Sequence, residues 1–224
     1  MTTYERYLRT IAGGGTPDRL VFFSDAVFAI AMTLLVVELK VPHVPDAQIG
    51  HELALLTPEF LSFVLSFVVI GAVWMSHHRK FRAINGYTQP LVRLNLVMLL
   101  AVASLPFTTS LLGRYGDTQI SVYLYAGTIA VIGFLMSAMW IYAWHRGLVN
   151  PDVTVDVFRF VLVQSFPIPG IFLLSIPVAA LAGATPAELT WIAAVPASLI
   201  INLVYRSFSA RTRHPAQDPE GNPQ

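Results

Sequence analysis

The sequence contains no cysteine and few charged residues, and each absence narrows the class of protein. Without cysteine the chain has no disulfide, no thiolate metal site and no cysteine nucleophile. Only 12% of the 224 residues are charged, whereas about a quarter is usual for a soluble globular domain. Hydrophobic residues make up 55% of the chain, which is more apolar surface than one core can bury. The composition therefore predicts a membrane protein with much of its apolar surface facing lipid.

Several motifs that carry chemistry are also missing. The sequence has no P-loop, no GxGxxG fingerprint and no acidic metal-binding cluster. No serine stands in a nucleophile elbow, and no T-V-G-Y-G segment marks an ordinary potassium-channel pore loop. We therefore expect no catalytic residue, no metal site, no cofactor and no nucleic-acid partner, and we predict that the protein is not an enzyme.

Six segments are long and apolar enough to cross a bilayer, whose ~30 Å hydrocarbon core requires about 20 helical residues. Helix-start prolines open the first, second and sixth of them, at Pro17, Pro58 and Pro186. Further prolines predict kinks in the fifth and sixth segments. The six segments are residues 19–40, 57–79, 91–113, 119–145, 157–183 and 186–208. We predict an all-α membrane protein with six transmembrane helices per subunit and no pore loop.

Basic residues gather at alternate ends of these segments. They lie before the first segment, between the second and third, between the fourth and fifth, and around the end of the sixth: Arg6, Arg9, Arg19, Arg79, Lys80, Arg82, Arg93, Arg146, Arg159, Arg206, Arg211 and Arg213. Since Lys and Arg concentrate in cytoplasmic loops, both termini are predicted to be cytoplasmic. The predicted organisation is a polar cytoplasmic arm over residues 1–18, a transmembrane domain over 19–208, and a disordered cytoplasmic tail over 209–224.

The first segment has a polar side and an apolar side. At ~100° per residue, Asp25 lies about 140° around the helix from Ile30, and Ser24 lies about 120° the other way. Spacings of four and three residues place an apolar stripe on the opposite side, made of Ile30, Leu34 and Val37 and interrupted by Thr33. We expect Ser24 and Asp25 to turn into the helix bundle, away from this stripe.

Polar groups inside the membrane are costly and are therefore candidates for function. The second segment ends with Trp74, His77 and His78, and the third carries Asn95 at the same depth as Asp25. A buried network that fixes helix packing would satisfy these groups. A proton relay through Asp25 and His77 is the alternative. A metal site at His77 and His78 is disfavoured, because neighbouring residues on a helix point about 100° apart.

The run Arg19-x-x-x-Phe23-Ser24-Asp25, followed by thirteen residues that are mostly apolar, resembles the RxxxFSD signature of the transmembrane protein 175 family. That family includes bacterial and endolysosomal potassium channels. The Trp74-x-x-His77-His78 ending of the second segment is similar too, as is the run from Asn95 to Leu105-Pro106-Phe107 in the third. The sequence departs from the family at Ala26, where glycine is common. The specific motifs all lie in the first three segments.

The resemblance implies a homotetramer in the bacterial plasma (inner) membrane, surrounded by lipid, with the first helix of each subunit lining a central pore. It implies a pore constriction and gate at Ile30, Leu34 and Val37, and a selectivity layer at Thr33. It also implies a structural network composed of Arg19, Phe23, Ser24, Asp25, Trp74, His77 and Asn95. The expected function is passive, potassium-preferring cation conduction with K+ as the permeant ion. A proton-coupled ion carrier using Asp25 and His77, and a structural membrane protein, are the alternatives.

Overall fold

The computed structural model describes Thr2 and residues 17–193, and every named element in this part of the chain is a helix. Five helical stretches there are long and apolar enough to cross a membrane, which makes this a multi-pass membrane protein. They are Asp18–Val37, Thr57–Arg82, Gln89–Tyr115, Gln119–His145 and Val155–Ala182. They coincide with the first five predicted segments. Most of the predicted arm, the whole tail and residues 194–208 of the sixth segment lie outside the described residues.

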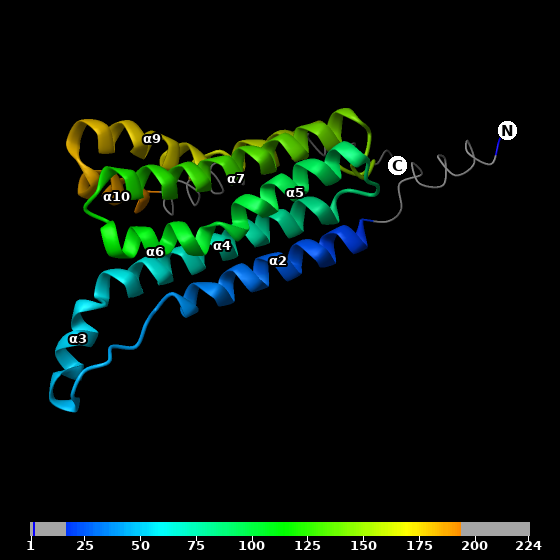
Figure 1. Ribbon diagram of the computed structural model, residues 1–224. Coiled ribbons are helices and arrows are strands. Elements are labelled where there is room, and N and C mark those ends of the chain that lie inside the picture. Colours follow the sequence, from blue (N-terminus) through cyan, green and yellow to red (C-terminus); the bar gives the residue numbers. More distant parts are fainter. Residues whose placement is uncertain (1, 3–16, 194–224) are drawn as a thin grey trace, which may run out of the picture.

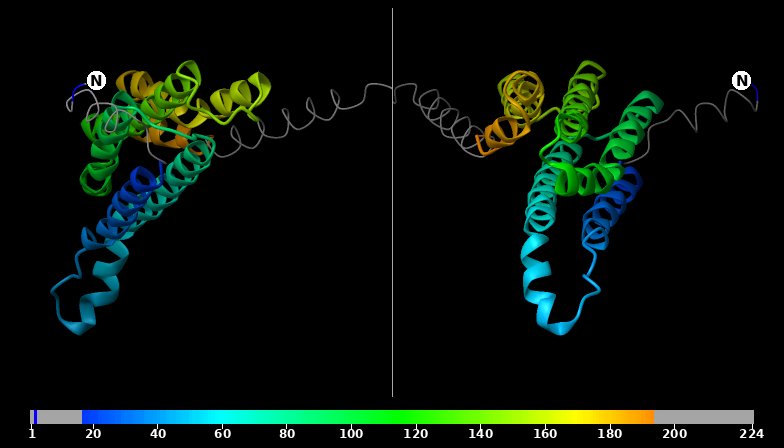
Figure 2. Two further views of the ribbon diagram at one scale, coloured as in Figure 1. Left: turned by 90° about the vertical axis from the view of Figure 1, so that its right-hand side faces the viewer. Right: turned by 60° about the vertical axis from the view of Figure 1, so that its left-hand side comes forward.

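Helix α2 (Asp18–Val37) ends three residues before its predicted end, because Pro42 and Pro45 favour extended backbone after it. The sequence predicted only a loop between this helix and the next span. The structure instead forms a short 3-10 helix η1 (Asp46–Gln48) and helix α3 (Ile49–Leu55), which leads directly into α4 (Thr57–Arg82). This connection projects beyond one end of the bundle (Figures 1 and 2).

Two predicted single helices are interrupted. The third span consists of α5 (Gln89–Ala103) and α6 (Leu105–Tyr115), and the fifth consists of α8 (Val155–Gln164) and α9 (Pro167–Ala182). Each interruption lies one or two residues before a proline, at Pro106 and Pro167. The proline ring clashes with the preceding turn, and its nitrogen donates no hydrogen bond. Pro177 is accommodated inside α9.

Helix α7 (Gln119–His145) lies at the centre of the bundle and packs against α5, α6 and α9. The short helix α10 (Ala184–Trp191) packs on α9 through an aromatic cluster. In this cluster the centroid of the Trp191 ring lies 5.0 Å from that of Phe172 and 5.3 Å from that of Tyr125. Helix α2 packs mainly on α4, α5 and α6, and it runs along the edge of the bundle (Figure 1). Within residues 17–193, one long side of α2 is therefore left uncovered.

The connections that follow α4 and α7 are joined by backbone hydrogen bonds. Asn85 N donates to Leu148 O and Asn150 N donates to Ala83 O, both at 2.8 Å. These bonds form an antiparallel bridge between Ile84 and Val149. The bridge ties together the ends of two helices at the side of the bundle that the basic residues predict to be cytoplasmic.

Candidate functional site

The buried face of α2 is joined to α4 and α5 by a chain of hydrogen bonds. Ser24 is 0% exposed, and its hydroxyl donates to Leu20 O at 2.8 Å. The Asn95 side chain on α5 donates to Ser24 Oγ at 2.9 Å. Its carbonyl oxygen accepts from His77 Nε2 on α4, also at 2.9 Å. The carboxamide of Asn95 thus bridges α2 and α4. It gives hydrogen-bond partners to Ser24 and His77, which would be costly to bury without them in an apolar environment.

Aromatic rings hold the imidazole of His77 in position. The ring stacks on Phe81 at 4.2 Å between centroids, and it lies tilted against Phe28 at 5.5 Å. Its Nδ1 atom is buried and has no hydrogen-bond partner among the described residues. The sequence analysis did not identify these two rings. Phe81 follows His77 by four residues, so helical spacing alone could have predicted that contact.

Asp25 belongs to a separate contact. Its carboxylate accepts from Trp74 Nε1 at 2.8 Å, and the carboxylate is only partly buried. In the described part of the chain, His77 bonds to Asn95, and no hydrogen bond joins His77 to Asp25. The two groups of the alternative proton relay are therefore held by different partners.

Two residues assigned to the network lie elsewhere in the subunit. Arg19 is exposed and Phe23 is 52% exposed, on the side of α2 that faces away from α4 and α5. Helical spacing gives the reason, because Phe23 precedes Ile30 by seven residues and both therefore share one side of the helix. Within one subunit the structure brings Ser24, Asn95 and His77 together, and Asp25 with Trp74, but not these two.

The predicted pore stripe lies on this uncovered side of α2. Ile30 is 58% exposed, Leu34 45% and Val37 67%. Thr33 is also exposed, and its hydroxyl donates to Ile30 O at 2.8 Å, which leaves the lone pairs of the hydroxyl oxygen available. The opposite side of the helix is filled by Phe28, Ala31 and Leu35, which are almost fully buried. One helix thus carries a packed face and a face that none of the described residues covers.

Comparison with known proteins bears on this helix directly. Residues 19–106 match the sequence model of the family described as "Endosomal/lysosomal potassium channel TMEM175". The matched region runs from α2 to the start of α6, and it contains both faces of α2 and all the network residues. The first three spans of the chain are thus similar in sequence to the TMEM175 family.

Similar proteins occur in bacteria. The chain is 33% identical over 132 residues to a protein of Streptomyces collinus named as a potassium channel, covering 57% of this chain and 63% of the relative. It is 35% identical over 131 residues to a potassium channel of Chamaesiphon minutus, covering 56% and 64%. The chain therefore matches just under two thirds of the length of these curated relatives.

The fold resembles a solved channel. The structure titled as a lysosomal potassium-selective channel TMEM175 homolog from Chamaesiphon minutus superimposes with a TM-score of 0.71 at 28% identity. The match covers 83% of this chain and 97% of that one. The similarity thus extends well beyond the first three spans, although the sequence motifs are confined to them.

Proposed function

We propose that this chain is a member of the TMEM175 family and forms a potassium-preferring cation channel in the bacterial plasma (inner) membrane. In the proposed assembly, four subunits surround a central pore, and the uncovered face of α2 lines it. The observation that carries the proposal is the exposure of Ile30, Thr33, Leu34 and Val37 on a helix whose other side is packed. Two similar bacterial proteins are named as potassium channels, which supports the choice of ion.

An apolar face on a membrane helix can also meet lipid, so the character of the face matters. Thr33 places a hydroxyl in the middle of the stripe, and Glu38 places an exposed carboxylate at its end. Neither group gains from contact with lipid tails, whereas both suit a path for cations. Closed rotational symmetry would bring equivalent faces together around one axis and remove them from lipid.

In this arrangement the stripe acts as the gate. Rings of Ile30 and Leu34 side chains make an apolar constriction, and such a constriction blocks ions by excluding water when it is narrow. Oxygen atoms of Thr33 replace part of the water around a potassium ion. Conduction is passive, since no described residue of the stripe other than the terminal Glu38 is ionisable.

The decisive experiment removes bulk from the constriction. We expect Leu34→Ala to raise the resting potassium current in planar bilayers and to reduce the preference for potassium over sodium. Leu34 is 45% exposed in the subunit, so the substitution should cost less than the ~2–5 kcal/mol typical of a buried leucine. A change in current would then reflect the pore and not a loss of folding.

A matched control makes the same chemical change elsewhere. Leu174 on α9 is 67% exposed, and α9 has no substantial contact with α2. Leu174→Ala should leave currents as in the wild type. Equal currents from Leu34→Ala and the wild type would reject the gate. A wild-type current that requires a proton gradient, and ignores a potassium gradient, would favour the proton-coupled carrier instead.

A further inference from the structure

A cavity unrelated to the α2 face lies between α4, α7 and α8. Its volume is about 430 Å³, within the range of about 300–1,000 Å³ that is typical of small-molecule sites. A smaller cavity of about 200 Å³ shares Ser76, Arg79, Lys80, Gln164 and Ser165 with it and continues toward α9. No residue of α2 lines either cavity, so this space is separate from the proposed ion path.

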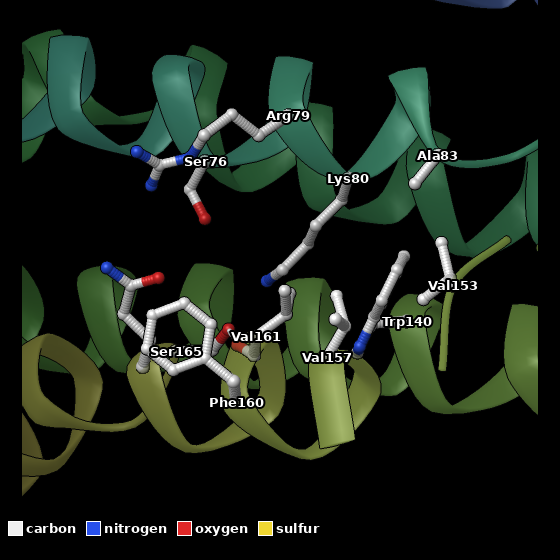
Figure 3. A pocket seen from close by; sticks show the side chains of 11 residues that line it. Ser76, Arg79, Lys80, Ala83, Trp140, Val153, Val157, Phe160, Val161 and Ser165 are labelled. Atoms are coloured by element: carbon white, nitrogen blue, oxygen red, sulfur yellow. Dashed lines mark hydrogen bonds between the residues drawn. The ribbon is translucent and has the colours of Figure 1, made fainter. Parts of the chain in front are cut away.

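The side chain of Lys80 projects into this cavity. It extends from α4 toward the residues of α8 (Figure 3). Lys80 is only 5% exposed, and its Nζ atom is buried with no hydrogen-bond partner among the described residues. A buried ammonium group without a partner is strongly unfavourable. A ligand that brings negative charge would remove this cost.

The cavity walls are chemically divided. Trp140, Val157 and Val161 form an apolar side, and Ser76 and Ser165 contribute hydroxyl groups (Figure 3). A second cation, the exposed guanidinium of Arg79, lies at the edge. A ligand that fits both parts has an anionic head and an apolar chain.

The position of the cavity suggests where such a ligand comes from. Lys80 lies in the last turn of α4, at the end of the bundle that the basic residues predict to be cytoplasmic. Basic pockets between transmembrane helices on that side are suited to anionic lipid headgroups. We propose that this cavity binds an anionic phospholipid, with Lys80 Nζ paired to the phosphate and an acyl chain along the apolar side of α8. This site is distinct from the conduction path.

Thermal unfolding of the full chain in neutral detergent tests the proposal. Short-chain phosphatidylglycerol should raise Tm in a saturable way, because a ligand that binds only the folded state stabilises it. Short-chain phosphatidylcholine, which is zwitterionic, should raise Tm much less. Inorganic phosphate at the same concentration should have little effect. An equal response to inorganic phosphate would identify a free-anion site and overturn the lipid assignment.

Variants separate the charge of Lys80 from its place on the helix. We expect Lys80→Gln to weaken the apparent affinity for phosphatidylglycerol about tenfold, which corresponds to ~1.4 kcal/mol. Arg82→Gln is the matched control, because Arg82 lies on the same helix end but is exposed and does not line the cavity. Its response should equal that of the wild type. If both variants lost the same affinity for phosphatidylglycerol, the effect would come from general surface charge, and the proposed site would be rejected.

Two further variants decide the matter if Lys80→Gln does not fold. Lys80→Arg keeps the positive charge and should retain the response to phosphatidylglycerol. Val161→Phe fills the apolar part of the cavity and should abolish that response while leaving the charge in place. A wild-type protein that responds to none of the three additives holds only water in the cavity, and that result also overturns the proposal.

Discussion

Replacing Asn95 with alanine tests the bridge between the three helices of the first half of the bundle. The substitution removes the acceptor of His77 Nε2 and the donor to Ser24 Oγ, each at 2.9 Å. His77 would then have no partner at either ring nitrogen, since its Nδ1 already has none in the described structure. Ser24 would keep its own bond to Leu20 O. The substitution therefore leaves mainly the buried imidazole of His77 without hydrogen-bond partners.

The size of the effect follows from these contacts. A buried polar group left without a partner costs about 1–3 kcal/mol, and an interhelical hydrogen bond in a membrane contributes about 0.6 kcal/mol on average. We expect Asn95→Ala to lower the free energy of unfolding by about 2–3 kcal/mol. Ser24→Ala removes one hydrogen-bond partner of Asn95, but Asn95 keeps its bond to His77. This substitution should therefore cost about 1 kcal/mol or less.

Reversible unfolding in mixed micelles, followed by tryptophan fluorescence at increasing SDS, measures both variants. The double variant His77→Ala/Asn95→Ala provides the internal check, because Asn95→Ala should cost much less when the histidine is already absent. A loss below about 0.5 kcal/mol for Asn95→Ala would refute the reasoning. So would a larger loss for Ser24→Ala than for Asn95→Ala.

Two other predictions concern packing in the second half of the bundle. A Cβ added at Gly133 would lie 2.5 Å from Cβ of Pro169 on α9, so Gly133→Ala should destabilise the protein by about 1–3 kcal/mol. Gly127→Ala on the same helix is the control, because a Cβ there meets nothing within 4 Å. It should be neutral or slightly stabilising in the same unfolding assay. Equal stability of the two variants would contradict the α7–α9 contact. Tyr125→Phe removes a buried hydroxyl 2.9 Å from Ser66 Oγ and should cost about 1 kcal/mol, and an unchanged unfolding midpoint would show that this hydrogen bond contributes nothing.

Hydropathy and helical spacing predicted most of what depends on local sequence. The first five spans follow from runs of apolar residues, and the two faces of α2 follow from the ~100° turn per residue. The same spacing places Phe23 on the exposed side with Ile30, away from Ser24, although Phe23 was assigned to the structural network. That assignment came from the family resemblance, which groups residues by motif and not by helix face.

Features that depend on tertiary neighbours could not be predicted in this way. The sequence analysis placed Lys80 in a basic loop, whereas the structure extends α4 to Arg82 and buries Lys80 against α7 and α8. Its burial is decided by helices that lie about 60 to 80 residues further along the chain. The helical part of the connection between α2 and α4 was missed for a different reason, because residues 46–55 are too short and too polar to give a membrane-helix pattern.

The bridge between the connections after α4 and α7 has a thermodynamic consequence for the cavity beside it. Ala83 lines the cavity and accepts from Asn150 N at 2.8 Å, and Val153, which also lines it, donates to Asn150 O at 2.9 Å. The rim is thus ordered by the fold itself before any ligand arrives. A preorganised rim reduces the conformational entropy lost on binding. A ligand of modest size that makes few contacts can therefore bind this cavity more tightly than it would bind one with a disordered rim.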